Sequence, residues 1–256
     1  MNCTGTPAYC GQLIQFSPSV TTSYDDYAIN GESAATQYRS WLRRDHVMLL
    51  KYAAAVVECK AAGWTTGNGG PLGLGDMSES NGAIPGTAVG SPGHPPNTHT
   101  NGRDIDIGYY QIGQANNHLR AICDHYDASG ADQYHCMSAP TTLDVWRTAL
   151  FFGTLFESSI LRIIGVDGKA GPLLVSAINE LCTTGWLNTA ACQNISLGYE
   201  ETNQGLGWYQ FHHHHAHVSV YESAPFWQPA TNAMPCIQPG CAGKQFKPNK
   251  HMFSVK

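Results

Sequence analysis

Two short segments that lie far apart in the chain, residues 98–107 and residues 211–218, constrain the fold more than any other feature. The first reads Thr-His-Thr-Asn-Gly-Arg-Asp-Ile-Asp-Ile and places Gly102 between His99 and Asp106. Glycine turns the backbone easily, and the isoleucines that follow alternate with aspartates, so this segment predicts a loop that leads into a strand. The second segment, Phe-His-His-His-His-Ala-His-Val, also alternates near its end. A fold that joins the two segments would gather imidazole and carboxylate groups at one site.

In the second segment, His215 and His217 fall on one face of a strand because side chains alternate with a period of two. Two imidazoles and one carboxylate are sufficient for a catalytic zinc site, which uses three protein ligands and keeps a fourth position open. We therefore predict a zinc site to which His99, Asp106 and the His215/His217 pair contribute.

Two simpler interpretations compete with a metal site. A run of four histidines is typical of an affinity tag, but tags lie at chain ends and residues 212–215 are internal. An isolated His or Asp is most often a solvated loop residue. The combination of a spaced His and Asp with a distant His-x-His argues against that interpretation.

These motifs resemble those of the penicillin-insensitive murein endopeptidases, within the wider group of lysostaphin-type enzymes, D-Ala-D-Ala metallopeptidases and the hedgehog signalling domain. The family's first motif reads like Ser-His-x-x-Gly-x-Asp-x-Asp-Ile, and residues 98–107 differ from it only in the leading threonine. Its second motif, His-x-x-His-x-His-Val, is matched by residues 212–218. Residues 75–78 and the Gly93-His94 pair resemble two upstream segments of the family, although this chain carries extra residues after the pair. The resemblance extends over about residues 45–222.

The resemblance implies a zinc endopeptidase that hydrolyses the D-alanyl to diaminopimelyl peptide cross-links of bacterial peptidoglycan. In this group the second His of the His-x-His pair binds zinc, so the resemblance implies that His99, Asp106 and His217 are the zinc ligands. It also implies that His215 and His212 act as acid or base and as oxyanion stabiliser, and strand parity supports His215 independently. Relatives with a Glu-x-x-His arrangement use the Glu as acid and base, but here that position is His214. Asp104 is expected to orient a ligand histidine or, equally, to be a structural carboxylate. No role is predicted for His213 or His214.

Two other functions remain open at this point. One is a zinc carboxypeptidase that acts on peptidoglycan stem peptides. The other is a non-catalytic binding module stabilised by zinc, because hedgehog domains keep such a site without demonstrated peptidase use. His212 and His215 favour the endopeptidase, since a purely structural zinc site closes its fourth position with a protein ligand.

Composition favours a secreted protein with a single domain. The 256 residues are enough to bury a full core. Charged residues make up 13%, about half of the usual quarter, so the surface must be polar through uncharged side chains. A net charge of -5 without a basic block argues against a nucleic-acid partner. No apolar run has the length of a membrane span.

The cysteines indicate an oxidising compartment. Eight of the nine form close pairs in sequence: Cys3 with Cys10, Cys123 with Cys136, Cys182 with Cys192, and Cys236 with Cys241. None has the Cys-x-x-Cys spacing of zinc sites, so we predict four local disulfides and a reduced Cys59. The N-terminal residues lack the basic start and apolar core of a signal peptide. We therefore expect a periplasmic or secreted protein from which a leader was removed.

The pattern of apolar residues predicts an α+β fold. It is a single domain with a central antiparallel sheet that carries the zinc site, flanked by helices and long disulfide-bearing loops. Helices are predicted to begin at Asp45, which caps the first one before a stop at Gly63, at Asp144 and at Pro172. Strands are predicted at residues 72–77, 106–112 and 160–166. We divide the chain into a loop-rich arm (1–44), a zinc metallopeptidase domain (45–228) and a C-terminal extension (229–256).

Overall fold

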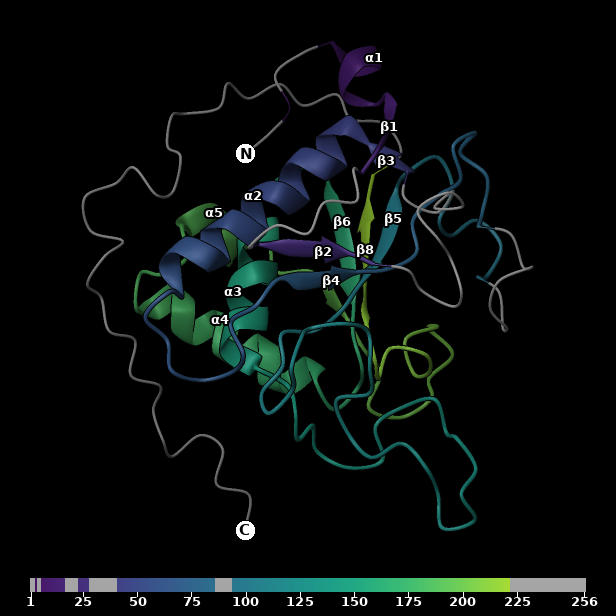
Figure 1. Ribbon diagram of the computed structural model, residues 1–256, viewed down its shortest axis with the longest axis vertical. Coiled ribbons are helices and arrows are strands. Elements are labelled where there is room, and N and C mark those ends of the chain that lie inside the picture. Colours follow the sequence, from purple (N-terminus) through teal and green to yellow (C-terminus); the bar gives the residue numbers. More distant parts are fainter. Residues whose placement is uncertain (1–2, 4–5, 17–22, 28–40, 86–93, 222–256) are drawn as a thin grey trace.

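The computed structural model describes residues 3, 6–16, 23–27, 41–85 and 94–221 (Figure 1). The main sheet contains β2 (Tyr24–Asp26), β4 (Leu72–Leu74), β5 (Asp104–Ile107), β6 (Leu161–Gly165), β7 (Leu197–Gly198) and β8 (Ala216–Val220). Their order across the sheet is β2-β4-β5-β8-β6-β7. The predicted α+β class is confirmed.

The centre of the sheet is antiparallel, as predicted, but both edges are parallel. Strands β4, β5, β8 and β6 run antiparallel to one another, whereas β2 is parallel to β4 and β7 is parallel to β6. A parallel pair needs a crossover connection. Between β6 and β7 the chain makes that crossover through two helices, α4 (Gly171–Thr183) and α5 (Thr189–Gln193).

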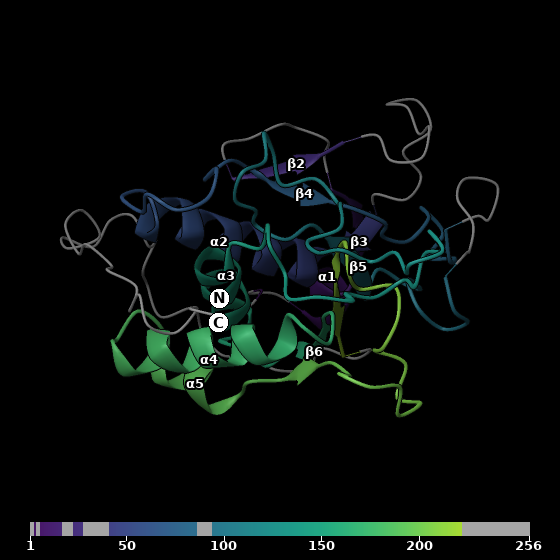
Figure 2. The ribbon, with the colours of Figure 1, turned by 90° about the horizontal axis from the view of Figure 1, so that it is seen from below.

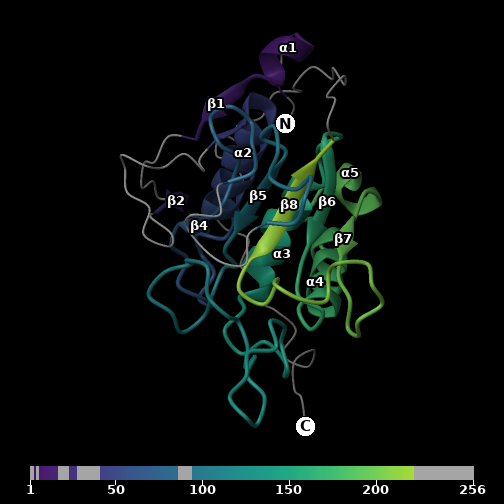
Figure 3. The same cartoon turned by 90° about the vertical axis from the view of Figure 1, so that its right-hand side faces the viewer.

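Helices pack on one side of the sheet. In Figure 3, α2 (Arg44–Lys60), α3 (Val145–Leu155) and α4 lie behind β5, β8 and β6. Figure 2 shows α3 between α2 and α4, and it contacts both. Every residue of α3 after Val145 is buried, because this helix is covered on all sides.

Local signals set the starts of α3 and α4 as predicted. The Asp144 carboxylate caps α3 by accepting a hydrogen bond from the Arg147 N–H at 3.1 Å. The Arg147 guanidinium in turn pairs with Asp144 at 2.6 Å and donates to the Trp64 carbonyl at 2.8 Å. Pro172 lies in the first turn of α4, where its missing N–H costs no hydrogen bond.

The predicted cap of α2 is wrong. Asp45 lies inside the first turn, and Arg43 precedes the helix without a side-chain capping bond. The Asp45 carboxylate pairs with the Arg43 guanidinium and accepts a hydrogen bond from the His46 N–H at 2.8 Å. An acidic residue in a first turn still stabilises the helix through its dipole. The helix ends at Lys60, three residues before the predicted stop at Gly63.

The pairing of β5 with β8 positions the polar residues of both motifs. Asp106 lies opposite His217, and Asp104 lies opposite Ser219. The residues that alternate with them are fully or almost fully buried in the hydrophobic core: Ile105, Ile107, Ala216, Val218 and Val220. Because side chains alternate between the faces of a strand, the polar set shares the face opposite the apolar one. The candidate site therefore stands on that face of the sheet.

All three strands with predicted bounds are shorter than predicted, and the one expected at residues 160–166 is β6, which loses one residue at each end. The strand expected at residues 106–112 begins earlier and ends earlier, as β5. It is followed by Gly108, where a Cβ would lie 2.2 Å from the Asn117 carbonyl oxygen, so this close approach requires glycine. The strand expected at residues 72–77 is β4, which keeps only the first three of these positions.

The N-terminal arm, expected to be irregular, contains ordered elements where the structure describes it. These are α1 (Pro7–Cys10), β1 (Leu13–Gln15) and β3 (Trp41–Arg43), besides β2. Strand β1 pairs antiparallel with β3 in a small second sheet, and β2 extends the main one. Strands of three residues are too short to show a period in the sequence. The predicted extension at 229–256 lies outside the described residues.

Three of the four predicted disulfides are confirmed. They join Cys3 to Cys10, Cys123 to Cys136, and Cys182 to Cys192. Cys236 and Cys241 lie outside the described residues, and Cys59 is half-buried in α2. These disulfides are consistent with an extracytoplasmic protein. Within the described ranges, no helix has both the length and the apolar character that a membrane crossing needs.

Candidate metal centre

The loop before β5 has a tight conformation that presents His99 to the sheet. His99 and Asn101 have left-handed backbone angles (φ 51° and 54°), which cost on the order of 1–3 kcal/mol each in residues other than glycine. Arg103 stabilises the loop by donating hydrogen bonds to the Thr100 hydroxyl at 2.8 Å and to its carbonyl at 3.3 Å. The His99 N–H donates to the Asp104 carboxylate at 2.9 Å. These contacts offset the strain and fix the position of the imidazole.

Gly102 gives this loop its turn, as the sequence predicts. Its φ is +66°, and a Cβ here would lie 2.5 Å from the Arg43 nitrogen and 2.5 Å from Leu13 Cδ2. Its carbonyl accepts a hydrogen bond from the Arg43 N–H at 3.1 Å. Both the backbone angle and the close approach therefore require glycine. The turn anchors the metal-motif loop to β3 and β1.

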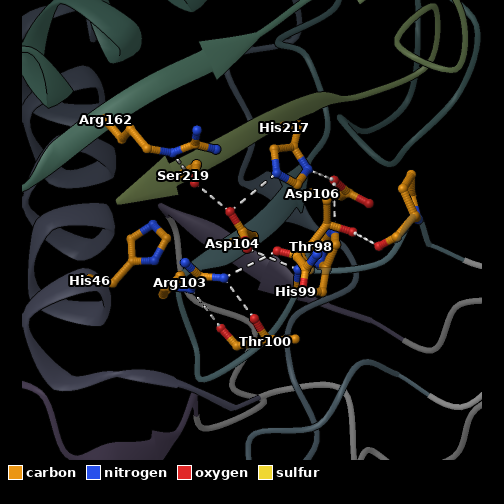
Figure 4. A network of polar contacts seen from close by, with 12 residues as sticks. His46, Thr98, His99, Thr100, Arg103, Asp104, Asp106, Arg162, His217 and Ser219 are labelled. Carbon is orange, nitrogen blue, oxygen red and sulfur yellow. Dashed lines mark hydrogen bonds and ion pairs between the residues drawn. The ribbon is translucent and has the colours of Figure 1, made fainter. Parts of the chain in front are cut away.

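Three imidazole nitrogens surround one carboxylate oxygen. From Asp106 Oδ1, His217 Nδ1 lies 3.0 Å away, His215 Nε2 lies 3.4 Å away and His99 Nε2 lies 3.5 Å away. Figure 4 shows His99 and His217 approaching Asp106 from the loop and from β8. All four side chains are buried. His215 was predicted to share a strand face with His217 but directly precedes β8, which begins at Ala216. The side chains of both histidines nevertheless reach the same oxygen.

These separations fit a shared metal ion. Ligands that bind tetrahedral zinc at about 2.0–2.1 Å stand about 3.3 Å from one another. The separations of His215 and His99 from Asp106 Oδ1, 3.4 and 3.5 Å, match that value and are long for N–H···O hydrogen bonds, which average about 2.9 Å. His217 Nδ1, at 3.0 Å, lies at hydrogen-bonding distance from the same oxygen. A donor set of imidazole and carboxylate also suits zinc. The residues around Asp106 could therefore hold a metal ion, and their donor atoms are of a kind that zinc accepts.

Asp104 supports this group from the same strand as Asp106. Its Oδ1 lies 3.3 Å from His217 Nε2 and accepts a hydrogen bond from the Ser219 hydroxyl. Arg162 Nε donates to the Ser219 oxygen at 3.0 Å (Figure 4). His217 therefore turns Nδ1 towards Asp106 while Asp104 holds its other nitrogen. Metal-binding histidines are commonly oriented by a carboxylate in this way.

His94 is a site residue that sequence reasoning left without a role. Among the described residues, His94, His99 and Asp106 offer ligand atoms that all lie within 4.8 Å of one another. The His94 ring lies 3.8 Å from the His99 ring, and its Nε2 lies 2.9 Å from Asp76 Oδ2. The available signal was the resemblance of residues 75–78 and of the Gly93-His94 pair to two family segments. The fold joins these segments through the contact between His94 and Asp76.

The charges of the group favour metal binding. Burial by itself would raise the pKa of Asp106, but His215 and His99 hold it well below its ordinary value. Burial lowers the pKa of His99 and lowers that of His215 further, which favours the neutral imidazole that binds metals. His217 differs: burial would lower its pKa, but Asp104 and Asp106 raise it to about 9. Metal binding there must displace a proton.

The histidine run at residues 212–215, directly before β8, lies next to the group around Asp106. The His212 carbonyl accepts a hydrogen bond from the Tyr109 hydroxyl at 2.9 Å, and burial lowers the pKa of His212 to about 4. Its ring lies 5.5 Å from the His215 ring and 5.4 Å from the Trp208 ring. His214 Nε2 lies 3.1 Å from His215 Nδ1. The structure thus places His212 beside His215, and it gives His214 a direct contact with the site.

A hollow of about 530 Å³ lies elsewhere, between α2 and residues 61–71. Tyr110 and Arg147 also line it, but none of its lining residues belongs to the metal-capable groups. This hollow therefore does not position a ligand for chemistry at Asp106.

No model of a known protein family matches the chain, and a search of the curated proteins finds no similar sequence. Function must therefore be argued from the geometry of the site and from the two motifs. The described residues contain two His/Asp groups that could hold a metal ion. The first is the group around Asp106. The second is formed by His125, Asp132 and His213, and sequence reasoning missed it. The available signal was the spacing of His125 and Asp132, which have the same separation in sequence as His99 and Asp106.

Proposed function

We propose that this chain is a zinc metalloendopeptidase that hydrolyses peptide cross-links of bacterial peptidoglycan, of the D-alanyl to diaminopimelyl type. The observation that carries the proposal is the convergence of three imidazole nitrogens on Asp106 Oδ1 at 3.0, 3.4 and 3.5 Å. The class of substrate comes from the resemblance of residues 98–107 and 212–218 to the murein endopeptidase motifs.

Zinc held by His99, Asp106 and His217 would polarise the scissile carbonyl and make an attacking water acidic enough to ionise near neutral pH. The chain itself must supply a group that carries the proton from the water to the leaving amine. His215 has the right position, because its Nε2 faces the same Asp106 oxygen as the proposed ligands. Its Nδ1 is held by His214 Nε2, which fixes the orientation of the ring.

His212 would act on the carbonyl oxygen of the peptide bond that is cut. Peptide hydrolysis places negative charge on the carbonyl oxygen, and a fixed N–H donor nearby stabilises that charge. The main chain of His212 is held by Tyr109, and its ring lies next to that of His215. Asp104 keeps His217 in its binding orientation. The proposal thus gives each histidine of the family motif a separate task.

Digestion of purified sacculi, followed by mass spectrometry of the fragments, tests the proposal. We expect the zinc-loaded protein to convert cross-linked muropeptides to monomers and to leave a new amino group on diaminopimelate. His215→Ala should keep zinc and fold, while cleavage falls by about 100- to 10,000-fold, the usual contribution of a general acid or base. Release of free D-alanine without loss of cross-links would instead indicate the carboxypeptidase.

The metal shell is tested with matched variants. His217→Ala should lose the zinc held at Asp106, and His94→Ala should keep more of it, because His94 Nε2 is already engaged by Asp76. His118→Ala is the control, since His118 forms a His–Asp pair with Asp25 at 2.8 Å outside both metal-capable groups. Undiminished zinc in His217→Ala would contradict the ligand assignment. A His215→Ala variant with full zinc and full cleavage would contradict the role of His215.

A further inference from the structure

The disulfide loop at residues 123–136 docks onto the segment that carries the histidine run. Two main-chain hydrogen bonds join them, from the Ile122 N–H to the His213 carbonyl at 3.0 Å and from the Phe211 N–H to the Tyr134 carbonyl at 2.6 Å. The rings of Tyr134 and Phe211 lie 5.1 Å apart across the same junction. Because the disulfide closes one partner and β8 anchors the other, side chains at this junction have fixed relative positions.

Three potential metal ligands meet there. His125, Asp132 and His213 offer ligand atoms that all lie within 4.8 Å of one another. His125 Nδ1 lies 2.9 Å from Asp132 Oδ1, and the rings of His125 and His213 lie 4.5 Å apart. The same Asp132 oxygen accepts a hydrogen bond from the Tyr134 N–H at 2.7 Å, which holds the carboxylate in place.

His213 gives an independent indication of a ligand. Only 5% of this residue is exposed, and its Nδ1 makes no hydrogen bond with any residue that the structure describes. A backbone hydrogen bond with Tyr134 engages the ring. A buried polar atom without a partner costs about 1–3 kcal/mol. A ring that is held by a main-chain carbonyl and keeps an unused nitrogen has the form of a metal-binding histidine.

We propose that His125, Asp132 and His213 form a second binding site for a divalent transition-metal ion, with zinc as the best-suited ion. Two imidazoles and one carboxylate are a donor set that zinc prefers, and three protein ligands are enough to hold it. The ion would satisfy the buried His213 nitrogen and would tie the disulfide loop to the histidine run. This site is independent of the proposed peptidase function.

The second site would also brace the first. The rings of His213 and His214 lie 4.7 Å apart, and those of His214 and His215 lie 4.4 Å apart. Since His214 Nε2 contacts His215 Nδ1, the run forms a continuous series of rings between the two metal-capable groups. A metal at His213 would therefore restrict the motion of His215 without touching Asp106.

Metal content of the full-length, disulfide-intact protein tests the second site. Metal-free protein is saturated with zinc, passed through a desalting column and analysed for zinc per chain. We expect about two zinc ions in wild type and one in each of His125→Ala, His213→Ala and Asp132→Asn. His118→Ala, the matched His–Asp control, should keep two. If His125→Ala and Asp132→Asn retain the wild-type content, the proposal is wrong, because a histidine run that bound zinc by itself would need neither residue.

An Asp106→Ala background separates this proposal from the peptidase proposal. The variant should keep one zinc ion, and zinc should raise its melting temperature. Adding His125→Ala should remove both the ion and the thermal shift. Loss of all zinc in Asp106→Ala alone would overturn the second site and leave the first intact. Wild type with a single zinc that depends on His125 and not on Asp106 would overturn the first site instead.

Discussion

Acid should destabilise this protein through His46, which lies in the first turn of α2 beside the metal-motif loop. The ring is fully buried, and its Nδ1 lies 3.5 Å from the Gly102 carbonyl oxygen. Burial lowers the pKa of His46 from its ordinary value of 6.5 to about 4, against smaller opposing effects of Gly102 and Asp104. The folded protein therefore keeps this ring neutral at pH 7.

The pKa of His46 in the folded protein is lower than its ordinary value in the unfolded chain, and this order decides whether acid raises or lowers stability. Because the folded-state pKa is the lower one, the unfolded chain takes up the proton first as the pH falls. The contribution of His46 to the free energy of unfolding is fully present above about pH 6.5 and is lost between pH 6.5 and about pH 4. The difference between these two pKa values corresponds to roughly 3 kcal/mol in the free energy of unfolding. A folded domain typically has a free energy of unfolding of about 5–15 kcal/mol, so the loss is a large part of it.

Urea unfolding of metal-free protein at pH 7 and pH 4 measures this effect. His46→Asn keeps an N–H donor near the Gly102 carbonyl and does not titrate, so it should lose about 3 kcal/mol less than wild type over that interval. Val47→Ala is the control: it removes buried methyl groups beside His46, lowers stability at both pH values and should keep the wild-type pH dependence. Equal pH dependence in wild type and His46→Asn would refute the reasoning.

Three further predictions concern the loop, the support of the site and the cysteines. Gly102→Ala should lower the free energy of unfolding by more than about 2 kcal/mol, because the strained φ and the contacts with Arg43 and Leu13 add together. Gly113 has a similar φ of +68° but open space around it, so Gly113→Ala should lower the free energy of unfolding by only about 1–2 kcal/mol in chemical denaturation. Equal losses in the two variants would contradict the role of the contacts around Gly102. Asp104→Asn should weaken zinc binding by about 10- to 100-fold, and chelator competition that finds unchanged affinity would remove Asp104 from the site. Peptide mapping without reduction should find a fourth disulfide between Cys236 and Cys241, whereas thiol labelling of either cysteine would contradict it.

Features that depend on neighbours in sequence could be predicted from the sequence. Asp144 caps α3 and Pro172 starts α4 because each acts on backbone groups within one helical turn. The three disulfides that the structure describes join cysteines 7 to 13 residues apart, which short loops bring together without help from the rest of the fold. The alternation that puts Asp104 and Asp106 on one face is equally local.

Contacts between distant segments escaped prediction. Gly108, the residue after β5, must be glycine because the Asn117 carbonyl, on a separate loop, occupies the space beside it. His94 joins His99 and Asp106 only because the loop before β5 folds back, with Asp76 holding the ring. His125 and Asp132 reach His213 through the docking of a disulfide loop, for which the sequence offers no periodic signal.

The sequence by itself determined that His99, Asp106 and the histidines of residues 212–217 are potential metal ligands and that Asp104 and Asp106 share a strand face, because residue type and the period of two are properties of the local chain. Only the tertiary structure decided that Asp106 lies opposite His217. A shift of one residue between β5 and β8 would turn the polar side chains of one strand towards the core. Because Ile105 and Val218 are buried on the opposite face, core packing fixes the register. The site is therefore assembled by core packing, which depends on the whole chain and not on either motif alone.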